Sequence, residues 1–504
     1  MFKVSPLFGD HAILPIGKEL RIFGTADEGE TIRATLTARD GAVTGQGMST
    51  ARDGRFLIHL PPQTLGAGPF TLTLTSDTMT FTANDLVTGF VFMAGGQSNM
   101  EWGLWNAQNG QEIIKIHDDP DLRYFNVPRV SVLDEEGLAA HEAAHWTKIA
   151  PHIGGDMSAV AYFFARQLRA KTGFPVGIVG CNWGGTSILS WMDDVALHRS
   201  VPALKAAEEY EATIEGITLE TWKQQQAAFQ AEMDEWNTKV AKLKEADPGI
   251  EWADIEAQAG VCPWHPPIGP GSPYRPGQLH RSMVDMIAPM ALSCILFYQG
   301  ESDEGRAADY GELLITLVTR WREIFADAEL PFYNVQLPMY IDANAKEDDR
   351  RWAVLRQQQE KAWHALRDSY LAVLIDAGEH GNIHPVDKQK PGERLARLFL
   401  ENFTHRQPAQ PWAMRKSTCG NVLTVELTGP VKARRGTPDL FEIAGEDGIY
   451  HPAQAEIDWH RIHLTSDAVP HPVKARYAWV NWAKVHVFSE YAPYLPLAPF
   501  VLED

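Results

Sequence analysis

A serine stands on a tight turn directly after a predicted buried strand. Residues 85–92 are apolar and β-branched enough for a parallel strand, and Gly95 and Gly96 let the backbone turn sharply before Ser98. Ligands of open α/β sheets bind at the carboxyl ends of strands, where a serine on such a turn is placed as a nucleophile. Serines more commonly cap helices. The turn therefore predicts catalysis only if a base, an oxyanion hole and an acid follow at other strand ends.

A second block, residues 182–188, also follows a predicted strand end and contains two adjacent glycines. A glycine lets its backbone N–H approach a ligand closely, so one of these N–H groups, together with that of Ser98, could hold a developing oxyanion. The sequence leaves open whether Gly184 or Gly185 is the donor, and we favour Gly185. A tight strand-to-helix turn is the alternative role for the pair.

Two later blocks could supply the base and the acid. Residues 376–385 contain His384, a candidate general base because an imidazole titrates near neutral pH, and its competitor His380. Residues 298–303 contain Glu301, a carboxylate that could reach the base. Taken separately, each of these residues is equally well explained as part of an ordinary solvated loop.

The residues Gly-Gly-Gln-Ser-Asn-Met-Glu-Trp at 95–102 resemble the nucleophile block of the sialate O-acetylesterase-like branch of the SGNH hydrolases, which includes related carbohydrate acetylesterases. The four blocks occur in the family's order, and the resemblance covers nearly the whole chain. It selects His384 as the base, since the residues from Pro385 to Ala396 match the family's histidine block. It also implies that the Gln299 side chain is a further oxyanion donor.

One position departs from the family, which commonly carries Asp-Ile-His-Pro where this chain has Asn382 followed by Ile, His and Pro. An amide can orient an imidazole but lacks the charge that stabilises imidazolium. The position three before the histidine, where other SGNH enzymes place an aspartate, is Gly381. We expect Glu301 to be the acid, with Asp376 as second choice and a Ser-His dyad as third.

The elements that position these blocks indicate an α/β fold, a doubly wound parallel sheet of about five strands as in SGNH (flavodoxin-like) hydrolases. Alternating patterns predict a β-sandwich-like domain at 1–88 and a second β region at 404–504, around a catalytic domain at 89–403. Within it we expect an irregular stretch at 106–155 and a helical, Pro-rich insertion at 199–273. The insertion's aromatic stripe is expected to be packing.

The composition is that of an ordinary globular protein with a formal charge of −20, which disfavours nucleic acid and anionic membranes as partners. The four cysteines show no metal-binding spacing, and the chemistry requires no metal or cofactor. No signal peptide or membrane span is recognised, so the chain as written is expected in the cytoplasm, or in the periplasm or outside the cell if it is a trimmed form. The sequence leaves room for a homo-oligomer.

These observations predict a serine esterase that removes acetyl groups from carbohydrates, with O-acetylated sialic acid as the first substrate. An acetylxylan-type esterase and a non-catalytic carbohydrate-binding protein are the alternatives. Further candidates for substrate contact are Gln97, Asn99 and Arg356. A sialic acid carboxylate requires a cation in the cleft, such as Arg356 or Arg275.

Overall fold

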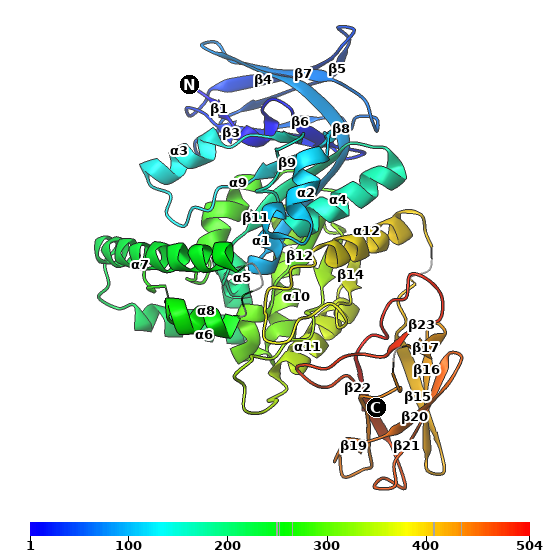
Figure 1. The fold of residues 1–504 in the computed structure, drawn as a ribbon. Helices are drawn as coiled ribbons and strands as arrows, with labels where there is room; N and C mark the ends of the chain where they lie inside the picture. Colours follow the sequence, from blue (N-terminus) through cyan, green and yellow to red (C-terminus); the bar gives the residue numbers. More distant parts are fainter. Residues whose placement is uncertain (248–249, 251, 265, 407–408, 435, 504) are drawn as a thin grey trace.

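One long strand, β8 (Thr80–Gly96), connects two parts of the molecule (Figure 1). Its first half pairs antiparallel with β7 (Phe70–Thr75), and its second half pairs parallel with β11 (Val176–Asn182) and β12 (Cys294–Tyr298). The structure is a computed structural model that describes residues 1–247, 250, 252–264, 266–406, 409–434 and 436–503. The domain boundary predicted at residue 88 falls inside β8, because this strand is continuous from Thr80 to Gly96.

The central sheet confirms the α/β class but is larger than predicted. Its strand order is β10–β9–β11–β8–β12–β13–β14, parallel throughout except for antiparallel β10 at the edge. The five expected strands are present, and two more lie in the stretch expected to be irregular. The further bounds are β9 (Asp119–Asn126), β10 (Thr147–Ile149), β13 (Phe332–Val335) and β14 (Ser369–Ala372).

A buried arginine explains why β9 is hard to recognise in the sequence. Arg123 interrupts the apolar pattern of the strand, yet it is 2% exposed. Its guanidinium donates to the backbone carbonyl oxygens of His11 and Asp85, at 2.7 Å each. These hydrogen bonds compensate the cost of burying a charged group. Hydropathy alone does not predict them, because it takes no account of contacts between distant residues. The remaining elements of the stretch are η2 (Leu104–Asn106), α2 (Gly110–Ile116) and α3 (Glu135–Ala143).

Helices cover both faces of the sheet. Phe92 of β8 packs its ring against Phe164 of α4 (Ala159–Thr172) and Phe399 of α12 (Gln389–Phe403). Phe297 of β12 faces the opposite side, because its partner in register is Gly95, three residues beyond Phe92. It contacts Trp321 of α10 (Tyr310–Ile324), which packs beside α11 (Arg351–Ala365).

The order β11–β8–β12 places the nucleophile turn where the strand connections diverge. The chain leaves β8 for one side of the sheet through β9 and β11, and returns to the other side of β8 through β12. Open α/β sheets bind their ligands at such switch points, outside the carboxyl ends of the strands. The short helix α1 (Ser98–Glu101) begins directly at this end of β8.

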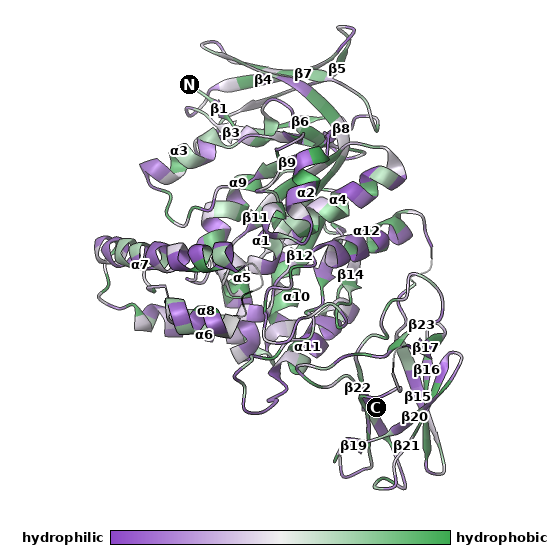
Figure 2. Cartoon of the chain, in the orientation of Figure 1, coloured by the Kyte–Doolittle hydropathy of each residue, from purple (hydrophilic) through white to green (hydrophobic). Residues whose placement is uncertain are grey.

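The insertion is helical, as expected, and its long helix lies beside the sheet domain (Figure 1). Its aromatic side chains Trp222 and Trp236 are buried, which confirms that the stripe is packing. Figure 2 shows apolar residues concentrated in the central strands, while α7 presents a largely hydrophilic surface. The helices of the insertion are α6 (Val201–Thr213), α7 (Leu219–Ala246) and α8 (Trp252–Ala259). The elements η3 (Ile188–Trp191) and α5 (Asp194–Arg199) precede it, and η4 (His280–Val284) and α9 (Asp285–Ile287) follow it.

Both ends of the chain form β structure, as the alternating patterns indicated. The first part contains β1 (Lys3–Val4), β2 (Ile13–Pro15), β3 (Leu20–Thr25), β4 (Thr31–Ala38), β5 (Val43–Thr50) and β6 (Arg55–Leu60). The last part contains β15 (Ala413–Cys419), β16 (Val422–Leu427), β17 (Val431–Ala433), β18 (Phe441–Ala444), β19 (His451–Pro452), β20 (Gln454–Asp458), β21 (Arg461–Thr465), β22 (Lys474–Tyr477), β23 (Val487–Ser489) and β24 (Phe500–Leu502). Among the described residues, no helix is both long and apolar enough to cross a bilayer.

Candidate active site

The structure brings the predicted nucleophile and base together. His384 Nε2 lies 2.8 Å from Ser98 Oγ, a hydrogen-bond distance that joins residues 286 positions apart. The turn before the serine requires glycine, because Gly96 has a φ of +133° and a Cβ there would lie 2.0 Å from the carbonyl oxygen of Tyr298. The histidine comes from the loop between β14 and α12. A neutral imidazole in this position can take the hydroxyl proton.

The surroundings of His384 favour the neutral imidazole. Its ring stacks on Trp102, with 5.4 Å between ring centroids and 23° between planes. Burial, aided by the positive charge of Lys388, lowers the pKa of His384 to about 4. Lys388 itself lies 5.3 Å from the centre of the Trp102 ring, so the indole contacts both base and cation.

Within the part of the chain that the structure describes, no carboxylate contacts the His384 imidazole directly. Among the described residues, no Asp or Glu side chain forms an ion pair with His384. Asn382, which replaces the family's aspartate, accepts from the backbone N–H of His384 at 3.0 Å and donates to Glu379 at 2.7 Å. The amide therefore shapes the histidine loop through the backbone.

A buried asparagine links the nucleophile turn to the histidine loop. Asn99 Nδ2 donates to Glu301 Oε1 at 2.6 Å and to the carbonyl oxygen of Ile383 at 3.0 Å, and Asn99 Oδ1 accepts from Lys388. Glu301 Oε2 has no hydrogen-bond partner among the residues that the structure describes. Burial raises the pKa of Glu301 to about 7, and burial lowers that of Lys388. We call this group of Asn99, Glu301, Lys388 and Ile383 the Asn99 clamp.

The clamp changes two expectations. Asn99, named as a substrate contact, is fully buried and cannot touch a sugar. Glu301, named as the acid, reaches the histidine loop through Asn99 and Ile383. The second choice, Asp376, forms a two-bond ion pair with Arg394 at 2.6 and 2.7 Å, which commits its carboxylate to α12.

The two glycines of the second block differ in what their N–H groups do. The N–H of Gly184 donates to the carboxylate of Glu101, which removes it from the candidates. Gly185 has a φ of +72°, which favours glycine. A Cβ on Gly184 would lie 3.3 Å from Ser98 Cβ, so the pair is next to the nucleophile. The N–H groups in the first turn of a helix have no intrahelical partner, and Ser98 occupies that turn of α1.

The Gln299 side chain is not placed to stabilise an oxyanion, which corrects the prediction. Its amide nitrogen donates to Gln97 Oε1 at 3.2 Å, to the Thr186 carbonyl oxygen at 3.1 Å and to Asp303 Oδ2 at 2.5 Å, and the residue is fully buried. Gln97 is 2% exposed and accepts from backbone N–H groups of the third block, so it is no substrate contact either. Both amides connect the three loops below the site.

Both cations predicted to receive a substrate carboxylate, Arg356 and Arg275, contact other groups of the protein. Arg356 is 1% exposed and donates to the carbonyl oxygens of Ala478 and Val480, so it links α11 to the last β region and cannot meet a substrate. Arg275 is paired with Glu211 at 2.7 Å.

Sequence reasoning missed a cation that pairs with the nucleophile block. Arg129 Nη1 lies 3.0 Å from Glu101 Oε1, the carboxylate that also accepts from Gly184. Its side chain is about half exposed. Arg129 stands outside all four blocks, in the stretch expected to be irregular, so no pattern marked it. Glu101 could have been noticed, because it belongs to the quoted nucleophile block.

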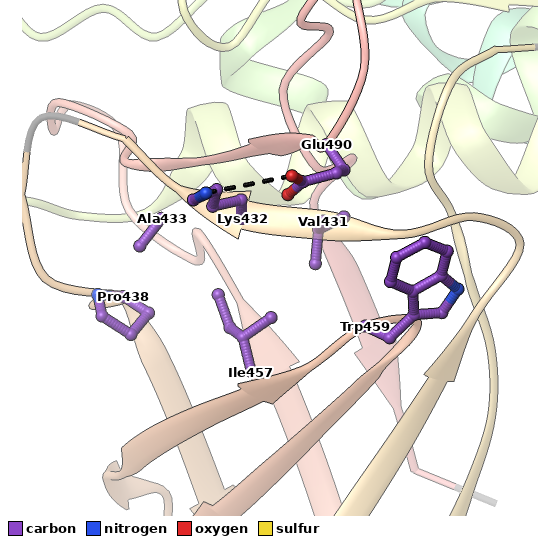
Figure 3. A pocket seen from close by; sticks show the side chains of 7 residues that line it. All are labelled: Val431, Lys432, Ala433, Pro438, Ile457, Trp459 and Glu490. Atoms are coloured by element: carbon purple, nitrogen blue, oxygen red, sulfur yellow. Dashed lines mark ion pairs between the residues drawn. The ribbon is translucent and has the colours of Figure 1, made fainter.

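A separate open groove lies in the last β region (Figure 3). Trp459 and Ile457 line it together with the ion pair between Lys432 and Glu490, whose charged atoms are 3.8 Å apart. The groove contains no pair of nucleophile and base, so it does not compete with Ser98 and His384 as a reaction centre. The described residues also hold no cluster of three His, Cys, Asp or Glu side chains suited to a metal ion.

Comparison with known proteins agrees with this geometry. The family described as "Carbohydrate esterase, sialic acid-specific acetylesterase" matches residues 88–246 and 264–399. The chain belongs to this family. The match spans the loops that bring Ser98, Gly185, Glu301 and His384 together.

Individual relatives extend over the full length. Sialate O-acetylesterase from Mus musculus is 25% identical across 100% of this chain and 94% of its own length, and the Homo sapiens protein is 24% identical across 93% and 85%. The crystal structure of a carbohydrate acetylesterase from Xanthomonas citri superposes with a TM-score of 0.76 at 27% identity, covering 100% of this chain and 99% of that one. The chain is therefore a carboxylic ester hydrolase that acts on O-acetylated carbohydrates.

Proposed function

We propose that this esterase works through an acetyl-enzyme on Ser98, on an SGNH-type sheet, with His384 as general base and acid. The 2.8 Å contact between His384 Nε2 and Ser98 Oγ at the sheet's switch point is the observation that carries the proposal. Serine attacks the ester carbonyl while the imidazole takes its proton. The imidazolium then protonates the departing sugar hydroxyl, and water activated by the same imidazole releases acetate.

The oxyanion hole consists of the backbone N–H groups of Ser98 and Gly185. The occupied N–H of Gly184 and the occupied amide of Gln299 support this choice, because both donors already have strong acceptors. Two preorganised donors aimed at the developing charge are a large contribution to catalysis in acyl transfer.

Glu301 acts on His384 indirectly, through the Asn99 clamp. The direction of each hydrogen bond supports this role: a lysine only donates and a carboxylate only accepts, so Lys388 and Glu301 fix which way the Asn99 amide faces. The amide N–H is thereby directed at Ile383, the neighbour of the base. The site works as a Ser98–His384 dyad whose histidine loop is held by a buried polar network.

O-acetylated sialic acid is the first substrate, and Arg129 is the group that would receive its carboxylate. Its half-exposed side chain, paired with Glu101 of the same short helix as Ser98, supports this assignment. A neutral O-acetylated polysaccharide is the alternative, favoured by the pairing of Arg129 with Glu101, which already neutralises the cation.

The test is acetate release by the wild-type enzyme and by S98A across a panel of O-acetylated sialic acids and xylo-oligosaccharides. We expect S98A to lose activity on every ester while melting at the wild-type temperature. R129M should lose activity on sialic acid esters alone. Retained activity in S98A contradicts the mechanism, and equal activity of R129M on both substrate classes assigns the neutral polysaccharide.

A further inference from the structure

An aromatic side chain from the helical insertion lies against the glycine of the oxyanion hole. A Cβ on Gly185 would lie 2.6 Å from Cζ2 of Trp264 and 3.2 Å from Cε1 of Tyr274. A Cβ on the adjacent Gly184 would lie 3.3 Å from Ser98 Cβ. Trp264 therefore lies beside Gly185, whose neighbour Gly184 is adjacent to Ser98.

Trp264 is exposed although it is large and apolar. Its side chain is 46% accessible to solvent, whereas Trp222 and Trp236 of the same insertion are buried. The Trp264 ring meets the Tyr274 ring edge-on, with centroids 6.5 Å apart and planes at 82°. Edge-to-face packing fixes the orientation of the indole and leaves a face of it open.

The loop that carries Trp264 is held in place by buried aromatic groups. Trp222 Nε1 donates to the Pro267 carbonyl oxygen at 3.0 Å, and the Trp222 ring fills the space where Gly269 and Gly271 would carry a Cβ. The Tyr210 hydroxyl bonds both the N–H and the carbonyl oxygen of Gly269. The described part of the loop is thus anchored to α6 and α7 before any ligand arrives, which reduces the entropy lost on binding.

We propose that Trp264, supported by Tyr274, forms a sugar-ring subsite that binds the pyranose carrying the scissile acetyl ester. The inference rests on the proposed function. An indole face adjoining a polar reaction centre suits the C–H face of a pyranose, while the ring's hydroxyls remain directed to water or polar groups.

The test compares W264A with wild type on two esters that share the acetyl group. Vinyl acetate has neither sugar nor aromatic ring, and O-acetylated xylo-oligosaccharide or N,O-acetylneuraminic acid supplies the pyranose. We expect W264A to lose at least tenfold in kcat/KM on at least one sugar ester, mainly through KM, and less than threefold on vinyl acetate. W264F, which keeps an aromatic face, should recover most of the loss.

W459A is the matched control, because Trp459 is 57% exposed but lies in the groove of the last β region. It should match the wild type on all esters. Equal losses of W264A on vinyl acetate and on sugars, or no loss on any sugar, overturn the subsite. Wild-type enzyme that fails on vinyl acetate and on every sugar ester refutes the proposed function instead.

Discussion

The Asn99 clamp makes a quantitative prediction for Asn99→Ala. The substitution removes the acceptor of Lys388 and the donors to Glu301 and Ile383. Leaving a buried hydrogen-bonding group without its partner costs about 1–3 kcal/mol of folding free energy, and more where that group is charged, as Lys388 and Glu301 are when ionised. We therefore expect a lower midpoint of thermal unfolding.

The same variant should turn over more slowly. The neutral bond to the Ile383 carbonyl oxygen contributes about 0.5–1.5 kcal/mol to holding the loop next to His384. Since 1.4 kcal/mol corresponds to a factor of about ten in rate, kcat should fall by up to about tenfold. KM should change little, because Asn99 is fully buried and does not contact a sugar.

Asn334→Ala is the control, because this residue is also an asparagine and is 2% exposed. Neither polar atom of its side chain has a hydrogen-bond partner among the described residues. The assay is acetate release from vinyl acetate at saturating substrate, combined with a thermal melt of each variant. If the two alanine variants melt at the same temperature and share the same kcat, the hydrogen bonds of Asn99 do not hold the loop and the reasoning is refuted.

Three other predictions follow from the site. The imidazole of His384 is an active base only above its lowered pKa, so kcat/KM should decline on the acid side near pH 4 as the ring becomes protonated. K388M removes a positive charge that lowers this pKa, so the decline should move to higher pH. G185A should abolish acetate release with a normal circular dichroism spectrum, because a Cβ there meets Trp264 at 2.6 Å and requires a strained φ; near-normal rates would exclude Gly185 from the oxyanion hole. D376A should lower kcat less than E301A does, and the opposite order in steady-state kinetics would make Asp376 the supporting acid.

Much of the fold was predictable from local pattern. The second half of β8 and the strands β11 and β12 are largely apolar runs, and such runs are what a sheet covered on both faces requires. Strand β9 was not predictable in the same way. Its buried Arg123 is compensated largely by groups far away in the chain, the carbonyl oxygens of His11 and Asp85 and the Asp85 carboxylate, and a local window of sequence contains none of them.

The sequence by itself, through the resemblance of its blocks to the family, selected Ser98 and His384 as the candidate nucleophile and base. Ser98 directly follows β8 and His384 lies in the loop after β14, so both come after the carboxyl ends of parallel strands, which meet at one edge of the sheet. The tertiary structure alone decided how the rest of the site is used. In it, the amides of Asn99 and Gln299 bond to buried partners, and Arg356 is buried. Arg129 pairs with Glu101 of the nucleophile block, and Trp264 lies against Gly185. Burial and the direction of a hydrogen bond depend on contacts between residues far apart in the chain, and local residue types do not specify them.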